Sequence, residues 1–223
     1  MTAKSIKALG VRALAAGLAA LACIIGGGVM TAGTAQAATC SDVEVVFARA
    51  STELPGLGIV GTPFVDGVKK NLPGKSVGSY AVNYAADITQ LSAGAGATDM
   101  TRHVTSVAAA CPNTKFVLGG YSQGASVTDI SIGIFTFLGQ GETIPANLAP
   151  RVSAVVVFGN PLALYSGHIP TSSPAYGPKS KEFCEAGDPV CANGVNGLAH
   201  LMYAFDGSAT EGARFAATRI LGS

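Results

Sequence analysis

Short runs of β-branched and aromatic residues recur along the chain after residue 42. Such runs are typical of strands that are buried on both faces of a sheet. The strongest are Val43–Ala48 and Val152–Phe158, and weaker ones lie at 76–84 and 115–118. The sequence therefore predicts four strands, each bounded by polar or turn-forming residues.

Between these runs, apolar residues recur at the three- and four-residue spacing of amphipathic helices. The predicted helices cover 61–72, 97–110, 123–138 and the residues after Asp206-Gly207. Strands that alternate with such helices favour right-handed βαβ units, hence an α/β sandwich with a mostly parallel sheet. The Pro-, Gly- and Ser-rich stretch 169–180 is predicted to be a surface excursion, and no linker divides the domain.

Residues 1–37 have the pattern of a secretory signal peptide. Lys4, Lys7 and Arg12 precede an apolar run, and Ala35-Gln36-Ala37 forms an A-x-A cleavage site. An uncleaved membrane anchor is the alternative. The small and polar residues between the apolar run and Ala37 favour cleavage instead. We expect a secreted domain of residues 38–223, either released or associated with the cell surface, without a stable transmembrane anchor.

Composition narrows the function classes. Charged residues are 12% of the chain, about half of the roughly 25% usual in soluble proteins. Only the segment from about 13 to 30 approaches the length of a membrane span, which excludes a multi-span protein. Removing residues 1–37 changes the formal net charge from +1 to −2. Neither value indicates a nucleic-acid partner.

Cysteine usage agrees with export. Cys23 lies in the signal segment, and four cysteines remain, an even number that suits an oxidising compartment. Three pairings are possible. Cys184 and Cys191 flank a Gly-Asp-Pro turn and most simply pair with each other, which leaves Cys40 for Cys111. A metal site is the rival interpretation, but the sequence has no C-x-x-C pair and no clustered histidines.

The pattern G-x-S-x-G occurs twice, around Ser76 and Ser122. A nucleophilic serine of this type needs a strand before it and a helix after it. Ser76 follows Pro73-Gly74 and precedes a strand, so it is predicted to be a turn serine. Ser122 has the required order, and the positive end of the following helix would face a developing oxyanion. A helix-capping serine is the alternative.

A serine nucleophile needs a base and an orienting acid, which follow the serine in α/β-hydrolase order. His103 precedes Ser122 and is predicted to be a surface residue. His168 follows it, but Asp129, a preceding acid, would point away from the site. His200 follows Asp188, which lies between Cys184 and Cys191. We therefore favour His200 and Asp188.

Three segments together resemble the cutinase family of serine esterases, particularly its secreted bacterial members. They are Cys40 with Ala48-Arg49-Ala50-Ser51-Thr52-Glu53, then Gly119-Gly120-Tyr121-Ser122-Gln123-Gly124-Ala125, then Phe183-Cys184, Gly187-Asp188-Pro189-Val190-Cys191 and His200-Leu201. The resemblance spans the whole mature chain. It implies a three-layer α/β-hydrolase-type sandwich without a large lid.

The resemblance also implies roles for individual residues. Ser122 would be the nucleophile, His200 the base and Asp188 the acid. The backbone N–H groups of Ser51 and Gln123 would form the oxyanion hole, assisted by the Ser51 hydroxyl. Disulfides would join Cys40 to Cys111 and Cys184 to Cys191. No metal site, metal ion or organic cofactor is implied.

One departure from the family concerns the residue before Ser51. Cutinases usually have glycine where this chain has Ala50. If that position needs a positive φ angle, alanine is strained there and the oxyanion hole is displaced. A secreted binding protein with little turnover is therefore the alternative to an esterase.

The expected substrates are short- to medium-chain carboxylic esters, with cutin-like polyesters, phospholipids or thioesters as further options. We expect a monomer that binds an ester or lipid-like small molecule. Leu162-Ala163-Leu164-Tyr165, Val195, Leu198 and Leu201 are predicted to form apolar rims around the cleft, with ordinary core packing as the alternative.

Overall fold

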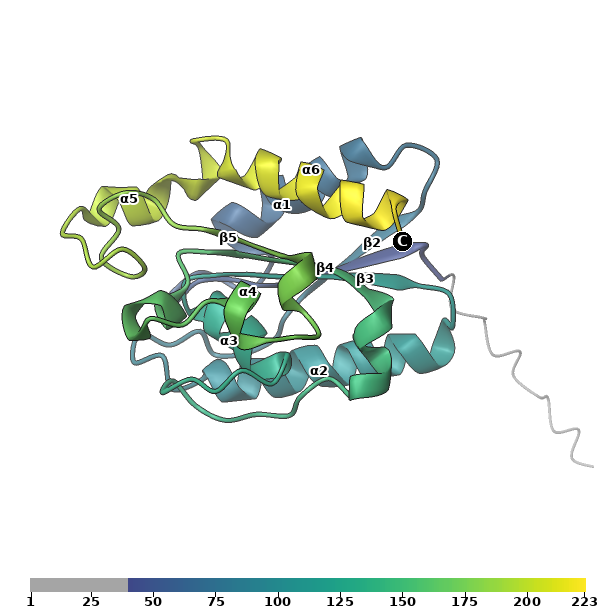
Figure 1. Cartoon of the computed structure of the whole chain (residues 1–223), viewed down its shortest axis with the longest axis horizontal. Coiled ribbons are helices and arrows are strands. Elements are labelled where there is room, and N and C mark those ends of the chain that lie inside the picture. Colours follow the sequence, from purple (N-terminus) through teal and green to yellow (C-terminus); the bar gives the residue numbers. More distant parts are fainter. Residues whose placement is uncertain (1–39) are drawn as a thin grey trace, which may run out of the picture. The chain divides into compact units, whose positions relative to one another are not determined.

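The computed structural model describes residues 40–223, so the predicted signal segment 1–37 lies outside the described residues. Five parallel strands form a single sheet in the order β2-β1-β3-β4-β5. The strands are β1 Val43–Ala48, β2 Val77–Ala81, β3 Lys115–Tyr121, β4 Val152–Phe158 and β5 Ser180–Phe183 (Figure 1).

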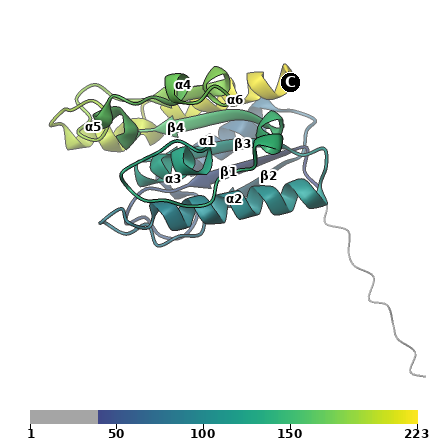
Figure 2. The ribbon, with the colours of Figure 1, turned by 60° about the horizontal axis from the view of Figure 1, so that its bottom comes forward.

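Helices cover both faces of the sheet. Helices α1 and α6 lie on one face and α2 and α3 on the other (Figures 1 and 2). The helices are α1 Gly58–Asn71, α2 Ala93–Ala110, α3 Gln123–Ser131, α4 Ile169–Ser172, α5 Gly197–Leu201 and α6 Ser208–Leu221. Short 3-10 turns cover Ala146–Arg151, Pro161–Tyr165, Gly177–Lys179 and Met202–Ala204. The predicted three-layer α/β fold with a parallel sheet is confirmed.

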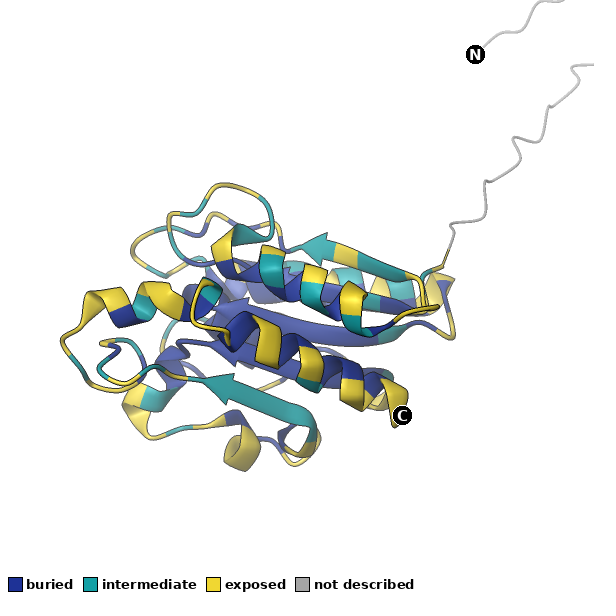
Figure 3. Ribbon diagram, turned by 90° about the horizontal axis from the view of Figure 1, so that it is seen from above, coloured by how far each residue is buried: buried dark blue, intermediate teal, exposed yellow. Residues whose placement is uncertain are grey.

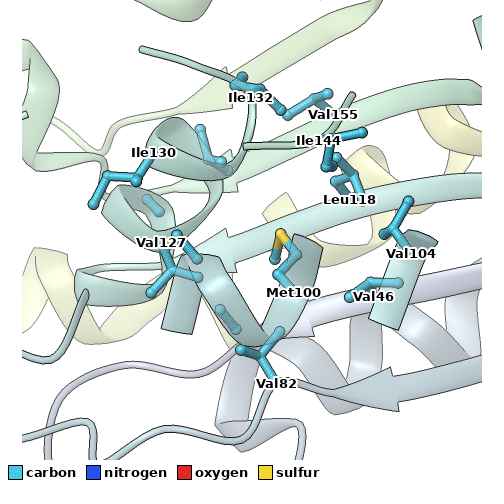
Figure 4. Close-up of a cluster of buried hydrophobic side chains, with 14 of the residues drawn as sticks. Val46, Val82, Met100, Val104, Leu118, Val127, Ile130, Ile132, Ile144 and Val155 are labelled. Carbon is cyan, nitrogen blue, oxygen red and sulfur yellow. The ribbon is translucent and has the colours of Figure 1, made fainter. Parts of the chain in front are cut away.

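The alternating side chains of the strands divide the core into two clusters. Val45 and Phe47 of β1 face α1 and α6, whereas Val46 faces α2 and α3. Figure 4 shows the second cluster, in which Met100 of α2 and Val127 of α3 lie over the central strands. Because both faces are covered, the three central strands are almost entirely buried, while β2 and β5 at the edges are half-exposed (Figure 3).

Helix α3 is shorter than predicted, because it ends at Ser131 rather than at residue 138. Gly133 adopts a positive φ of 81°. The N–H of Gly133 donates to the carbonyl of Ile130, and that of Ile134 to Asp129. This is the hydrogen-bond pattern that closes a helix at a left-handed residue. The apolar residues that follow therefore form a loop, although their sequence continues the helical pattern.

The stretch 169–180 is more structured than a surface excursion. It contains α4, and Ile169 and Tyr176 are buried in the core. It leads directly into β5, a strand that the apolar pattern did not predict. Two of the four residues of β5, Lys181 and Glu182, are charged, so β5 carries no hydrophobic signal.

Two disulfides join the expected cysteines. Cys40 pairs with Cys111, 71 residues away, and Cys184 pairs with Cys191, seven residues away. Both are consistent with an extracellular, oxidising environment. Within residues 40–223, no helix is long and apolar enough to cross a membrane.

The longer disulfide should contribute the larger share of stability. Closing a 71-residue loop lowers the entropy of the unfolded chain by an amount worth about 4 kcal/mol, against about 2.5 kcal/mol for the seven-residue loop. We expect Cys40→Ala/Cys111→Ala to lower Tm by about 10 °C. Differential scanning calorimetry measures this, with Cys184→Ala/Cys191→Ala as the comparison. Equal decreases of Tm in the two double variants would contradict the larger contribution of the Cys40–Cys111 disulfide.

Candidate active site

The chain connections diverge at the carboxyl ends of β1 and β3. From β1 the chain crosses to β2 on one side, and from β3 it crosses to β4 on the other. Ligands of open parallel sheets bind where connections diverge in this way. Ser51 follows β1 and Ser122 follows β3, so both serines lie at this point.

Ser122 occupies a strained turn between β3 and α3. Its φ and ψ angles are 56° and −119°, a conformation rare for residues other than glycine. Its backbone N–H donates to the Phe158 carbonyl of β4 at 2.9 Å. A side chain at Gly120 would collide with the Gly124 backbone, and one at Gly124 with the Ala48 carbonyl. The two glycines therefore allow the sharp strand-to-helix turn.

The structure brings Ser122, His200 and Asp188 together in a chain of hydrogen bonds. The Nε2 atom of His200 lies 2.9 Å from the Ser122 Oγ, and Nδ1 lies 2.8 Å from the Asp188 Oδ2. Ser122 and Asp188 are buried, and the His200 ring is 15% exposed. Nucleophile and base in hydrogen-bond contact, with an acid behind the base, is the geometry of serine activation.

Asp188 is held rigidly inside the loop closed by Cys184 and Cys191. The Val190 N–H donates to its Oδ1 at 2.7 Å. Its backbone carbonyl accepts from the N–H groups of Ala192 and Gly194. The side chain is fully buried, and these bonds hold its carboxylate beside His200.

Two tyrosines complete the site, and the sequence reasoning missed both. The Tyr203 hydroxyl donates to the Asp188 Oδ2 at 2.5 Å, and the Tyr121 hydroxyl donates to the His200 carbonyl at 2.5 Å. Burial, and then the hydrogen bond to Asp188, raise the pKa of Tyr203, so its hydroxyl remains a donor. Its position three residues after His200, one helical turn on, is the signal that could have indicated it.

Ser51 and Gln123 lie against each other at the carboxyl ends of β1 and β3. The Ser51 hydroxyl donates to the Gln123 Oε1 at 3.0 Å, and the Gln123 Nε2 donates to the Ser92 Oγ at 3.2 Å. Gln123 is the first residue of α3, so its backbone N–H has no carbonyl within the helix. Within residues 40–223, the Ser51 N–H has no acceptor either, whereas that of Thr52 bonds to Ala86.

The loop that carries Ser51 is fixed by two charged residues of its motif. The buried Arg49 guanidinium donates to the carbonyls of Glu53, Val82 and Tyr84. The Glu53 carboxylate accepts from the N–H groups of Ala50 at 2.6 Å and Ile59 at 2.7 Å. Arg49 and Glu53 thus hold the loop in its conformation.

The structure shows no positive φ angle, and hence no backbone strain of the expected kind, at Ala50. Ala50 is absent from the described non-glycine residues with positive φ, and the left-handed residue of this loop is Thr52, with φ of 65°. Ala50 is buried in the core cluster under α1. Alanine therefore fits its position without the strain that would displace Ser51.

The other candidate residues lie away from this site. The Ser76 hydroxyl donates to the Asp42 Oδ2 at 2.8 Å at the amino ends of β2 and β1, as predicted for a turn serine. His168 lies 3.0 Å from the Glu182 Oε2. His103 is less exposed than predicted, since its ring stacks on Tyr80 and is 19% exposed. Within residues 40–223, no cluster of His, Cys, Asp and Glu side chains could hold a metal ion.

Several of the apolar residues expected at the cleft rim are exposed. Val195 is fully exposed, and Leu198 and Leu201 are 71% and 54% exposed. Tyr165 is 56% exposed, whereas Leu162 is buried in the core. Leu162 therefore follows the alternative of ordinary core packing, whereas the other four residues are exposed.

The sequence of this chain matches a known family. The family model described as Cutinase matches residues 39–220. The chain belongs to the cutinase family. A cutinase from Kineococcus radiotolerans is 59% identical over 185 residues, which are 81% of this chain and 62% of that protein. This chain therefore matches less than two thirds of that cutinase's length.

Two further proteins are similar to this chain. The carboxylesterase Culp1 of Mycobacterium tuberculosis is 42% identical over 193 residues, which cover 83% of this chain and 85% of that protein. The structure of a Trichoderma reesei cutinase, in complex with a C11Y4 phosphonate inhibitor, is similar with a TM-score of 0.64. It is 30% identical and covers 81% of this chain and 77% of that one.

The buried acid Asp129 suggests a test of how stability depends on pH. Asp129 of α3 is fully buried, and its Oδ1 accepts from the Asn160 amide at 3.3 Å. Burial raises the pKa of Asp129 well above its usual value, against the lowering effect of the Asn160 hydrogen bond. The folded protein therefore holds this proton more tightly than the unfolded chain.

Stability should accordingly fall as pH rises from about 4 through the folded-state pKa of Asp129. We expect Asp129→Asn to have a higher Tm than wild type at pH 8, with the difference shrinking towards pH 4. Asp66→Asn, an exposed change on α1, is the matched control. An Asp129→Asn protein that is less stable at every pH would contradict this account.

Proposed function

We propose that the protein is a secreted serine esterase that hydrolyses short- to medium-chain carboxylic esters through an acyl-serine intermediate. The observation that carries this proposal is the hydrogen-bonded chain from Ser122 through His200 to Asp188, with Ser122 in a strained turn at the start of α3. Residues 38–223 would form the mature domain, and its two disulfides support an extracellular location.

The direction of proton transfer follows from the donors around Asp188. Its carboxylate already accepts from the Tyr203 hydroxyl and the Val190 N–H. We infer that it also accepts from the Nδ1–H of His200, which leaves Nε2 without a proton and facing the Ser122 hydroxyl. His200 can then take the Ser122 proton as the Oγ attacks the ester carbonyl carbon.

The remaining steps use the same groups. The tetrahedral oxyanion would be bound by the backbone N–H groups of Ser51 and Gln123, at the positive end of α3. Collapse of this intermediate breaks the ester C–O bond, and the proton on His200 passes to the leaving alcohol. A water molecule, deprotonated by His200, then attacks the acyl-serine carbonyl; the bond from that carbon to the Ser122 Oγ breaks, His200 returns the proton to Oγ, and the carboxylic acid leaves.

The relatives support this substrate class. The chain is similar to proteins named cutinase and carboxylesterase and to a cutinase that binds a phosphonate inhibitor. A phosphonate resembles the tetrahedral intermediate of ester hydrolysis, so a site of this geometry is expected to bind one. Neither a metal nor an organic cofactor takes part in the proposed mechanism.

The first test removes the nucleophile. We expect the wild-type protein to hydrolyse p-nitrophenyl butyrate and to be labelled by a fluorophosphonate at Ser122. We expect Ser122→Ala to be unlabelled and to lose at least about 10⁴-fold in kcat, since serine catalysis depends on the covalent step. Mass spectrometry locates the label. A wild-type protein that neither turns over nor reacts would favour the non-catalytic binding protein, and an active Ser122→Ala would show that the nucleophile is misassigned.

The second test addresses the oxyanion hole. We expect Ser51→Ala to lower kcat about 10²-fold with little change in KM, because the Ser51 hydroxyl bonds to the Gln123 Oε1 and so holds the two N–H groups of the oxyanion hole in position. Ser51→Thr retains the hydroxyl and should keep most of the activity. If Ser51→Ala instead raises KM at unchanged kcat, Ser51 contributes to substrate binding and not to the oxyanion hole.

A further inference from the structure

The ring of Tyr203 is fully buried beside the ring of His200. Its centroid lies 6.1 Å from that of Phe158 and 5.8 Å from that of Tyr121. A Cβ atom at Gly159 would lie 2.7 Å from the His200 ring and 3.1 Å from the Tyr203 ring, so both rings pack against the Gly159 backbone. Packing of the ring therefore fixes the place of Tyr203 independently of its hydroxyl group.

The Tyr203 hydroxyl bonds to two parts of the loop that Cys184 and Cys191 close. It accepts a hydrogen bond from the Glu185 N–H at 3.0 Å and donates to the Asp188 Oδ2 at 2.5 Å. Because a phenol has a single hydroxyl proton, the bond to Asp188 uses its only donor. The hydroxyl therefore joins the acid to the first turn of its own loop.

The two oxygens of the Asp188 carboxylate have different partners. Oδ1 accepts from the Val190 N–H, whereas Oδ2 is within hydrogen-bond distance of both the Tyr203 hydroxyl and the His200 Nδ1. The terminal torsion of an aspartate side chain is soft, so bonds to its oxygens determine the plane of the carboxylate. Val190 on one oxygen and Tyr203 on the other set that plane, and Oδ2 then faces His200.

We propose that Tyr203 is a positioning residue of the hydrolytic reaction, which orients the Asp188 carboxylate and limits how strongly it holds the protonated His200 ring. This role rests on the esterase function proposed above. A donor on Oδ2 withdraws negative charge from the oxygen that stabilises the imidazolium. The imidazolium then forms less readily in the resting enzyme, so Nε2 stays available as a base at lower pH. Tyr203 thereby extends activity towards acid pH.

The other titratable side chains around these residues are three carboxylates and one phenol, those of Glu53, Glu185, Asp206 and Tyr121. Within residues 40–223, none of these four groups bonds to the Asp188 carboxylate or to the His200 ring. Helices α1 and α6 pack against the Tyr203 turn with apolar residues. Because Tyr203→Phe leaves all of these groups in place, a changed pH profile in that variant reports the lost hydroxyl.

The test removes the hydroxyl and keeps the ring. Tyr203→Phe loses the donor to Asp188 but retains the packed aromatic side chain. Tyr176→Phe is the matched control, since Tyr176 is also buried, lies in the other core cluster, and has a hydroxyl without a hydrogen-bond partner within residues 40–223. Values of kcat and KM for p-nitrophenyl butyrate are measured from about pH 4 to about pH 9. Circular dichroism and thermal unfolding check the fold.

We expect Tyr203→Phe to lower kcat about tenfold at its pH optimum, with KM within about twofold of wild type, because the buried hydroxyl acts on orientation and not on substrate binding. The acid limb of kcat/KM should move up by about half a pH unit, since Asp188 then holds the imidazolium more strongly. Tyr176→Phe should keep the wild-type kcat and acid limb. A Tyr203→Phe protein with an unchanged acid limb would overturn the proposal, whatever its Tm.

A second substitution at the same position reverses the expected sign. Replacement of Tyr203 by 3-fluorotyrosine keeps the hydroxyl and makes it a stronger donor, because fluorine makes a phenol more acidic. The acid limb of kcat/KM should then move to lower pH, opposite to its movement in Tyr203→Phe. This comparison decides the question if Tyr203→Phe does not fold, and a movement to higher pH would contradict the proposal.

Proton NMR tests the same role without turnover. The His200 Nδ1–H that faces Asp188 gives a low-field resonance whose position follows protonation of the ring, and its titration midpoint should move to higher pH in Tyr203→Phe. If wild type hydrolyses no ester but this midpoint moves, the role of Tyr203 stands and the esterase function fails. If wild type hydrolyses esters while neither the midpoint nor the acid limb moves, the role of Tyr203 is wrong and the esterase function stands.

Discussion

The close approach of three backbone segments is the constraint on which the rest of the site depends. The end of β1, the end of β3 and the first turn of α3 meet where Gly124 lies against the Ala48 carbonyl and Gly120 lies against Gly124. A methyl group at either glycine would push a segment away. Only this contact lets Ser122 leave β3 at a positive φ and still begin α3 beside the Ser51 loop.

A second unit carries the base and the acid. The residues from Cys184 to Tyr203 are tied by a short disulfide, by the Tyr203–Asp188 bond and by the Tyr121 hydrogen bond to the His200 carbonyl. His200 of this unit contacts the Ser122 hydroxyl, and its carbonyl accepts a hydrogen bond from Tyr121, the residue before Ser122. Different features therefore position the two groups. The glycines determine the position of the Ser122 nucleophile, and the disulfide and hydrogen bonds determine the orientation of the His200 imidazole.

Much of the fold could be predicted because its signals are local. β1 and β4 are strongly apolar, and α1 and α6 are clearly amphipathic. The end of α3 could not be predicted, since Gly133 closes it against an uninterrupted apolar pattern. In the site, chain order and motif spacing singled out Ser122, Asp188 and His200, which the structure brings together. The role of Tyr121 in the site was not predicted, because its hydrogen bond joins residues 79 positions apart in the sequence.

The polar composition of β5, which hid this strand from the sequence pattern, has a consequence for the molecule in concentrated solution. An edge strand exposes unpaired backbone groups that can recruit a strand of another molecule and start aggregation. β5 has only four residues, and Lys181 forms an ion pair with Glu211 of α6 at 2.5 Å. A short edge with charged side chains is a poor template for such pairing, so the sheet can end there without a covering element.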